Sequence, residues 1–177
     1  PILEEIIDSA SKVNALSLLI VGGPPKGRNG YNEMVKELEK IAEEKGANAK
    51  FTGPLPYSMM NECYAACDIL IVGHYVDRRL RDYALPKKLL DAMGYKIPVI
   101  VGPYDTRKKI VERYNCGLVS EEWTNALTKL SNDKRLRKEM GENGFKAFKM
   151  NYAWELQEKK LLKVYKNLLE DKSSEEM

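Results

Sequence analysis

Short apolar runs alternate with amphipathic stretches along most of the chain. The apolar runs are typical of strands buried in a parallel sheet, and they predict strands at 16–21, 50–53, 68–72, 98–101 and 117–119. Apolar residues recur at helical spacing around these runs, which predicts helices over 2–13, 32–45, 58–66, 86–94 and 106–114. This alternation predicts an α/β fold: a Rossmann-like, doubly wound parallel sheet with helices on both faces.

The C-terminal part of the chain has a different pattern. Residues 121–170 predict a helical tail with breaks near Asn132 and Tyr152, and residues 172–177 are expected to fray. No repeat or low-complexity linker divides the 177 residues, so a single domain over 1–177 is expected. A chain that opens on Pro1 is expected to be a fragment or a processed form.

Composition narrows the classes of function. With 31% charged and 44% hydrophobic residues, a soluble globular chain is expected. Its net charge of +3 gives no case for binding nucleic acid, and no apolar run reaches the ~18 residues of a membrane span. Three cysteines, an odd count without disulfide spacing, favour a reducing cytosol. With a lone histidine, they predict no metal site.

The stretch 85–102, LPKKLLDAMGYKIPVIVG, carries the candidate site. Pro86 suits the first turn of a helix, because its missing N–H is not needed there. Lys88 and Asp91 lie three residues apart on the face away from the sheet, and helical side chains lean toward the N-terminus of their helix. That end offers free N–H groups and partial positive charge, which suit a phosphate. A lysine that can bind a phosphate, next to a carboxylate that can bind the diol of a sugar, indicates nucleotide binding.

The run PKKLLDAM at 86–93, followed by Gly94 and KIPVI at 96–100, resembles the donor-site signature of family 4 (group 1) glycosyltransferases. It is similar to the Pro-x-Lys-Leu-x-Glu-x-Met form found in polysaccharide biosynthesis. Other segments resemble that family in the same order, at 18–22, 51–53, 64–68, 115–119 and 154–169. The resemblance implies the C-terminal, donor-binding domain of a two-domain GT-B enzyme. Such an enzyme transfers sugar from a UDP-, GDP- or ADP-sugar to a saccharide or a lipid-linked acceptor.

The resemblance also implies roles for individual residues. Asp91 accepts hydrogen bonds from the ribose diol, and Lys88 offsets the charge of the departing diphosphate, so these two are the candidate catalytic residues. The remaining residues expected to contact the nucleotide follow a strand or precede the central helix: Gly22, Gly23, Gly53, Pro54, Leu55, His74, Tyr83, Ala84, Leu85 and Pro86. No obligatory metal or cofactor is implied.

The implied partners are the nucleotide-sugar donor and an N-terminal acceptor domain that this sequence lacks. The expected location is the cytoplasm. Basic residues of the tail, among them Lys159 and Lys163, add an expected peripheral contact with the inner face of a membrane.

Two features depart from the family pattern. The family pairs its acids as Glu-x7-Glu, but the position eight before Asp91 is Tyr83, and Asp91 itself stands where Glu is usual. The family's first strand of this domain, with the Arg and Lys that clamp the diphosphate, would precede Ile2. In the strand order 3-2-1-4-5-6 that strand lies in the middle of the sheet. Either the strands therefore pair unusually or something else fills the gap.

Plainer interpretations remain open. If no ligand binds there, Asp91 forms only a solvated ion pair with Lys88 or with Lys87. The charged stretch 74–84 is expected to be a loop, whose arginines (Arg78, Arg79 and Arg81) are either solvated or in contact with an anion. The alternative functions are a nucleotide-sugar epimerase of the same architecture, which a single histidine disfavours, and a non-catalytic nucleotide-binding or regulatory module.

Overall fold

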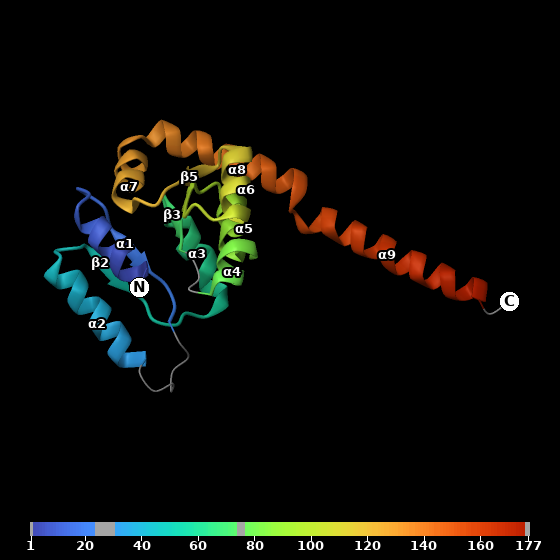
Figure 1. Cartoon of the computed structure of the whole chain (residues 1–177), viewed down its shortest axis with the longest axis horizontal. Coiled ribbons are helices and arrows are strands. Elements are labelled where there is room, and N and C mark those ends of the chain that lie inside the picture. Colours follow the sequence, from blue (N-terminus) through green and yellow to red (C-terminus); the bar gives the residue numbers. More distant parts are fainter. Residues whose placement is uncertain (1, 24–30, 74–76, 176–177) are drawn as a thin grey trace.

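The computed structural model describes residues 2–23, 31–73 and 77–175, which form parallel strands covered by helices (Figure 1). In chain order the elements are α1 (Ile2–Ser11), β1 (Leu18–Ile20), α2 (Tyr31–Glu44), β2 (Ala49–Phe51), the 3-10 helix η1 (Tyr57–Met59), α3 (Met60–Ala65), β3 (Leu70–Val72), α4 (Arg78–Tyr83), α5 (Lys87–Gly94), β4 (Val99–Val101), α6 (Asp105–Tyr114), β5 (Gly117–Val119), α7 (Trp123–Asn132), α8 (Lys134–Asn151) and α9 (Trp154–Glu175). The predicted Rossmann-like α/β fold is confirmed.

The strands form two parallel sheets, one of β1 and β2 and one in the order β3-β4-β5. Among the described residues, β1 pairs only with β2, and β3 pairs only with β4. A common core joins the sheets, because Leu18 of β1, Ile71 of β3 and Ile100 of β4 belong to one apolar cluster. The interruption separates the pair β1-β2 from the sheet β3-β4-β5, and in the family's strand order the first strand of the domain lies in the middle of the sheet.

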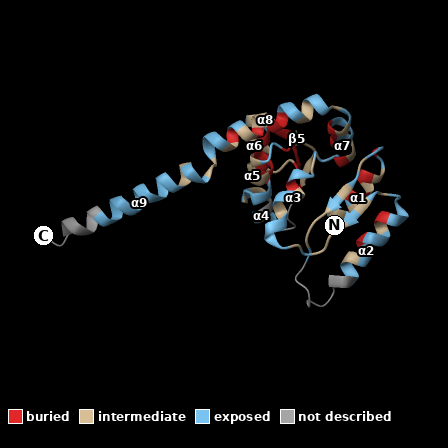
Figure 2. Ribbon diagram, turned by 180° about the vertical axis from the view of Figure 1, so that it is seen from behind, coloured by how far each residue is buried: buried red, intermediate tan, exposed pale blue. Residues whose placement is uncertain are grey.

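The strand β4 forms the centre of the larger sheet. Val99, Ile100 and Val101 are completely buried, as expected for a strand covered on both faces. Val99 and Val101 pack among residues of α5, α6 and α8, whereas Ile100 points to the other face and packs against α1 and α7. The predicted placement of helices on both faces is therefore confirmed, and Figure 2 shows the buried residues gathered between these layers.

The tail breaks where the sequence predicts. Helix α7 ends at Asn132 and α8 ends at Asn151. The Asp133 side chain accepts a hydrogen bond from the N–H of Leu136 at 2.8 Å, which caps the start of α8. Helix α9 then projects away from the other elements, with an exposed surface (Figures 1 and 2).

One further observation concerns the C-terminal end of the tail, and a second concerns membrane-spanning helices. The predicted fraying is wrong for residues 172–175, because α9 continues to Glu175, and residues 176–177 lie outside the described residues. Within the described ranges, no helix combines the length and the apolar character that crossing a membrane requires.

The predicted loop at 74–84 is partly helical, since α4 occupies Arg78–Tyr83. Asp77 Oδ1 accepts a hydrogen bond from the N–H of Arg79 at 2.9 Å, which supports the first turn. The side chains of Arg78 and Asp82 lie 3.6 Å apart, one turn from each other along the helix. These local polar contacts explain a helix in a stretch that lacks an apolar stripe.

Candidate functional site

The N-terminus of α5 lies at the carboxyl edge of the larger sheet. The chain reaches α5 after β3 and passes from α5 into the parallel strand β4, so α5 begins on the side where β3 ends. Ligands of doubly wound sheets bind at this edge. Pro86 precedes the helix, and no described side chain caps its first turn. The N–H groups of Lys87 and Lys88 are therefore placed to meet an anion.

Asp91 is held on two sides. Lys87 Nζ lies 3.0 Å from Asp91 Oδ1 and 2.9 Å from Oδ2. The hydroxyl group of Tyr64, on α3, donates a hydrogen bond to Oδ2 at 3.0 Å. The Asp91 side chain is 22% exposed. The carboxylate therefore lies at the surface of α5, within reach of a ligand, and is not buried against the sheet.

Lys87 also reaches the segment that follows β2. Its Nζ atom lies 3.1 Å from Tyr57 Oη and 5.5 Å from the centre of the Tyr57 ring. The hydrogen bonds to Asp91 and then to Tyr57 raise the pKa of Lys87, which keeps it charged at neutral pH. Tyr57 is 77% exposed, so an accessible aromatic ring lies beside Lys87. The sequence offered the spacing of Lys87 and Asp91 as a signal, but none for Tyr57.

Tyr64 positions the carboxylate from a buried place. Its ring stacks on Tyr95, with ring centres 5.0 Å apart and planes inclined by 23°. The Tyr95 hydroxyl in turn donates a hydrogen bond to Asn61 Oδ1. Burial, followed by the hydrogen bond to Asp91, raises the pKa of Tyr64 to about 12. The hydroxyl therefore keeps its proton and remains a donor at neutral pH.

The glycines expected at the site lie at one edge. The N–H of Gly22, after β1, donates a hydrogen bond to the carbonyl of Gly53, after β2, at 3.1 Å. Both have positive φ, 100° and 64°, which favours glycine. Of the two residues that follow Gly53, Pro54 is exposed and Leu55 is half-buried. The exposed Gly23 continues the first of these loops.

The residues expected just before α5 differ in exposure. Tyr83 is 78% and Leu85 is 40% exposed, Ala84 is half-buried, and Pro86 is buried. Lys88 is exposed and, among the described residues, has no ion-pair partner; the ion pair with Asp91 belongs to Lys87. The predicted contact of His74 lies outside the described residues.

Arg107 is a buried charged residue that sequence reasoning missed. Its side chain, on α6, is completely buried, and its Nη1 atom donates a hydrogen bond to the carbonyl of Gly73 at 3.0 Å. Its guanidinium group lies 5.8 Å from the centre of the Tyr104 ring. Gly73 directly follows β3, so Arg107 fixes the backbone where this strand ends, at the carboxyl edge of the sheet.

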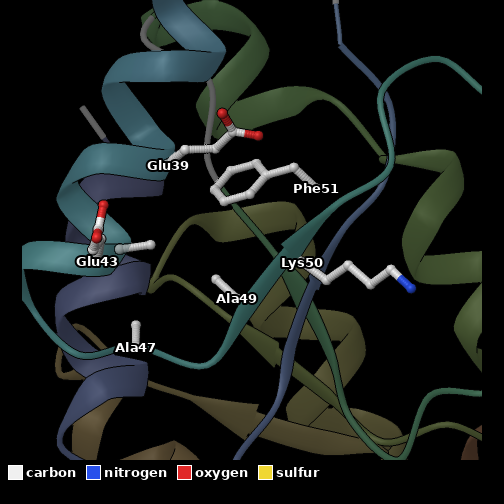
Figure 3. A pocket seen from close by; sticks show the side chains of 7 residues that line it. Glu39, Glu43, Ala47, Ala49, Lys50 and Phe51 are labelled. Atoms are coloured by element: carbon white, nitrogen blue, oxygen red, sulfur yellow. The ribbon is translucent and has the colours of Figure 1, made fainter.

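A hollow of about 360 Å³ lies elsewhere, between α2 and β2 (Figure 3). It is lined by Glu39, Ala42, Glu43, Ala47, Ala49, Lys50 and Phe51. In Figure 3 the Lys50 amine points away from the hollow, while Glu39 and Glu43 stand at its side on α2. Two carboxylates repel a phosphate, so this hollow does not suit the diphosphate of a nucleotide.

Solved structures identify the architecture. Sucrose-phosphate synthase from Thermosynechococcus elongatus matches with a TM-score of 0.79 and 19% identity, over 96% of this chain and 42% of that one. HepE from Anabaena, in complex with UDP and glucose, matches with a TM-score of 0.74 and 16% identity, over 92% of this chain and 44% of that one. The fold is that of a GT-B glycosyltransferase domain, as the sequence predicted.

Sequence relatives identify the family. Residues 3–147 match the family described as "Glycosyl transferases group 1". An uncharacterized glycosyltransferase from Methanocaldococcus jannaschii is 31% identical over an alignment of 147 residues that covers 80% of this chain. The chain belongs to the group 1 glycosyltransferases, and the predicted family is confirmed. It spans 35% of the length of this curated relative.

Proposed function

We propose that this chain is the donor-binding domain of a group 1 glycosyltransferase. In this proposal it binds a nucleotide-diphosphate sugar, whose sugar the whole enzyme transfers to a saccharide or lipid-linked acceptor. The observation that carries the proposal is the position of Asp91, which presents a surface carboxylate from α5, the helix whose uncapped N-terminus lies at the carboxyl edge of the sheet. The UDP and glucose bound to HepE make UDP the first nucleotide to test.

Each residue has a definite task in this proposal. Asp91 accepts hydrogen bonds from the two hydroxyl groups of the ribose. Lys88 and the first N–H groups of α5 hold the diphosphate, and the charge of Lys88 stabilises it as it departs from the sugar. The segment 53–55 borders the base. Gly22 and Gly23 let the ligand approach the backbone.

The acceptor-binding domain and the cationic clamp for the diphosphate belong, in this proposal, to a part of the enzyme outside this sequence. Helix α9 offers that domain a surface of exposed apolar residues: Leu161, Leu162, Val164, Tyr165, Leu168 and Leu169. The chain alone then binds nucleotide weakly and transfers no sugar. The free cysteines Cys63, Cys67 and Cys116 fit a cytoplasmic location, and the lysines of α9 remain the basis for a predicted contact with a membrane surface.

Calorimetric titration of the chain with UDP, GDP and ADP tests the proposal. One of these nucleotides is expected to bind, and Asp91→Ala is expected to cost about 1–3 kcal/mol of binding free energy. It should also lower the free energy of unfolding by about 1.5 to 3 kcal/mol, because the Tyr64 hydroxyl loses its charged acceptor. Glu44→Ala is the matched control, because Glu44 forms the same kind of ion pair with a lysine four residues earlier, Lys40, at 3.5 Å on α2. Equal affinities of Asp91→Ala and the unaltered chain would refute the role of Asp91.

One observation favours a second candidate, a non-catalytic nucleotide-binding module. Tyr83 stands at the position where the family pattern has its first acid, and its side chain points into solvent with 78% exposure. A radiolabelled-sugar assay on the complete enzyme distinguishes the two functions. Transfer of label supports the transferase, whereas tight nucleotide binding without transfer supports the module.

A further inference from the structure

Lys87 occupies the atoms of Asp91 that a ribose diol needs. Its Nζ atom lies within 3.0 Å of both carboxylate oxygens, and Tyr64 donates to one of them, Oδ2. A carboxylate accepts about four hydrogen bonds in all, and these contacts already use three. A diol needs two. The hydrogen bonds of Lys87, Tyr64 and a bound diol therefore exceed the capacity of Asp91 by one, so a protein donor must give up at least one of its contacts.

The two protein donors differ in how firmly they are held. Lys87 is 67% exposed and forms an ion pair within one helix, an arrangement that contributes little to stability because water screens the two charges. Tyr64 is buried and stacks on Tyr95, so its hydroxyl cannot move without repacking α3 against α5. Lys87 is the donor that leaves at lower cost.

We propose that Lys87 is an internal substitute for the ribose: it holds the Asp91 carboxylate when no nucleotide is bound, and the ribose diol displaces it. This inference rests on the proposed function, because it assigns the diol to Asp91. Tyr57 gives the displaced ammonium group a place to remain, since its hydroxyl and its ring already contact Lys87. Lys87 is then a residue that lowers nucleotide affinity, while Tyr64 is a positioning residue that stays in place.

The test uses substitutions with opposite expected effects. Lys87→Met removes the substitute and is expected to tighten binding between about 1.5-fold and 5-fold, the equivalent of an exposed ion pair. Lys87→Arg is expected to weaken binding, because a guanidinium group holds a carboxylate through two parallel hydrogen bonds. Lys40→Met, which removes an exposed lysine from an ion pair on α2, is the matched control and should leave the affinity unchanged.

The titrations use whichever of UDP, GDP and ADP binds most tightly, and the 2′,3′-dideoxy form of the same nucleotide. Lys87→Met should tighten the ribose form and leave the dideoxy form unchanged, because only the ribose form competes for Asp91. Urea denaturation of each variant confirms that the exposed substitutions leave the fold intact.

Each contrary result identifies which idea is wrong. Weaker or unchanged binding of the ribose nucleotide by Lys87→Met overturns the inference, as does equal tightening of both nucleotides, which is a general effect of charge. Tighter or unchanged binding by Lys87→Arg also overturns it. Absence of binding by the unaltered chain and by every variant overturns the proposed function itself, and the inference with it.

Discussion

The hydroxyl group of Tyr64 donates a hydrogen bond to Asp91 Oδ2 across 3.0 Å, between side chains 27 residues apart in the sequence. The contact joins α3 to α5 and fixes the orientation of the one carboxylate that α5 carries. Orientation matters at such a site, because a hydrogen bond weakens steeply when its geometry is poor.

Tyr64→Phe removes this hydroxyl group while keeping the ring that stacks on Tyr95. We expect the free energy of unfolding to fall by about 1.5 to 3 kcal/mol, the value of a hydrogen bond to a charged acceptor, and nucleotide binding to weaken. Urea denaturation and calorimetric titration measure the two effects. Tyr95→Phe is the control, because it removes the contact with Asn61 and leaves Asp91 untouched. Equal nucleotide affinities of the two variants would contradict the positioning role of Tyr64.

The stability of the protein should fall in alkaline solution through the same residue. The pKa of Tyr64 is raised from 10.0 to about 12 by burial and by its bond to Asp91. Between these values the unfolded chain has released the proton and the folded chain still holds it, so stability decreases as pH rises from 10.0 to about 12. Below this window the contribution of Tyr64 is complete. Denaturation midpoints of the unaltered protein should fall more steeply with pH than those of Tyr64→Phe, and parallel slopes would exclude this effect.

Arg107→Met should destabilise the end of β3. Methionine has a side chain of similar length, but it is apolar and lacks the charged group that donates to the Gly73 carbonyl. A loss of about 2 to 3 kcal/mol in unfolding free energy is expected, since the carbonyl loses a charged partner. Arg113→Met, on the exposed side of the same helix, should change stability by less than about 0.5 kcal/mol. Similar losses for both variants would show that the burial of Arg107 has no energetic importance.

Close packing of α8 predicts a strong effect at one glycine and a weak effect at another. A Cβ atom on Gly141 would stand 2.0 Å from the backbone oxygen of Lys96, so Gly141→Ala must push α8 away from the turn before β4. We expect a loss of about 2 to 3 kcal/mol, typical of overpacking. A Cβ atom on Gly94 would meet the Phe148 ring at an ordinary 3.6 Å, so thermal unfolding should find Gly94→Ala close to the unaltered protein. A stable Gly141→Ala variant would show that this contact relaxes easily.

Much of the fold could be predicted from the sequence because burial leaves a periodic pattern. The runs around β1, β3 and β4 are apolar since these strands are covered by helices, and the breaks at Asn132 and Tyr152 mark helix ends. Helix α4 was missed, because polar contacts of Asp77 and Asp82 stabilise it and leave no apolar period. The separation into two sheets was not predicted from the residue pattern either, since pairing depends on which strands are present.

The candidate site could be predicted only where it is local. Asp91 and its lysine neighbours lie within one helix, so their spacing places them together. Tyr57 lies 30 residues from Lys87, and Tyr64 lies 27 residues from Asp91. These contacts depend on how the segments after β2 pack against α5, and no short-range period encodes that. The contact of Arg107 could not be predicted for a related reason, because its partner is a backbone carbonyl and no side chain marks that position in the sequence.

The division of the strands into two sheets gives the molecule two regions of unequal local stability. Strands β1 and β2 have three residues each and bond only to one another among the described strands, a size that is marginal in isolation. Their amide protons should exchange with solvent well before those of β4, which is bonded on both sides. A nucleotide that touches Gly53 on one sheet and α5 beside the other would bridge the two. Nucleotide binding should then make the smaller sheet more rigid.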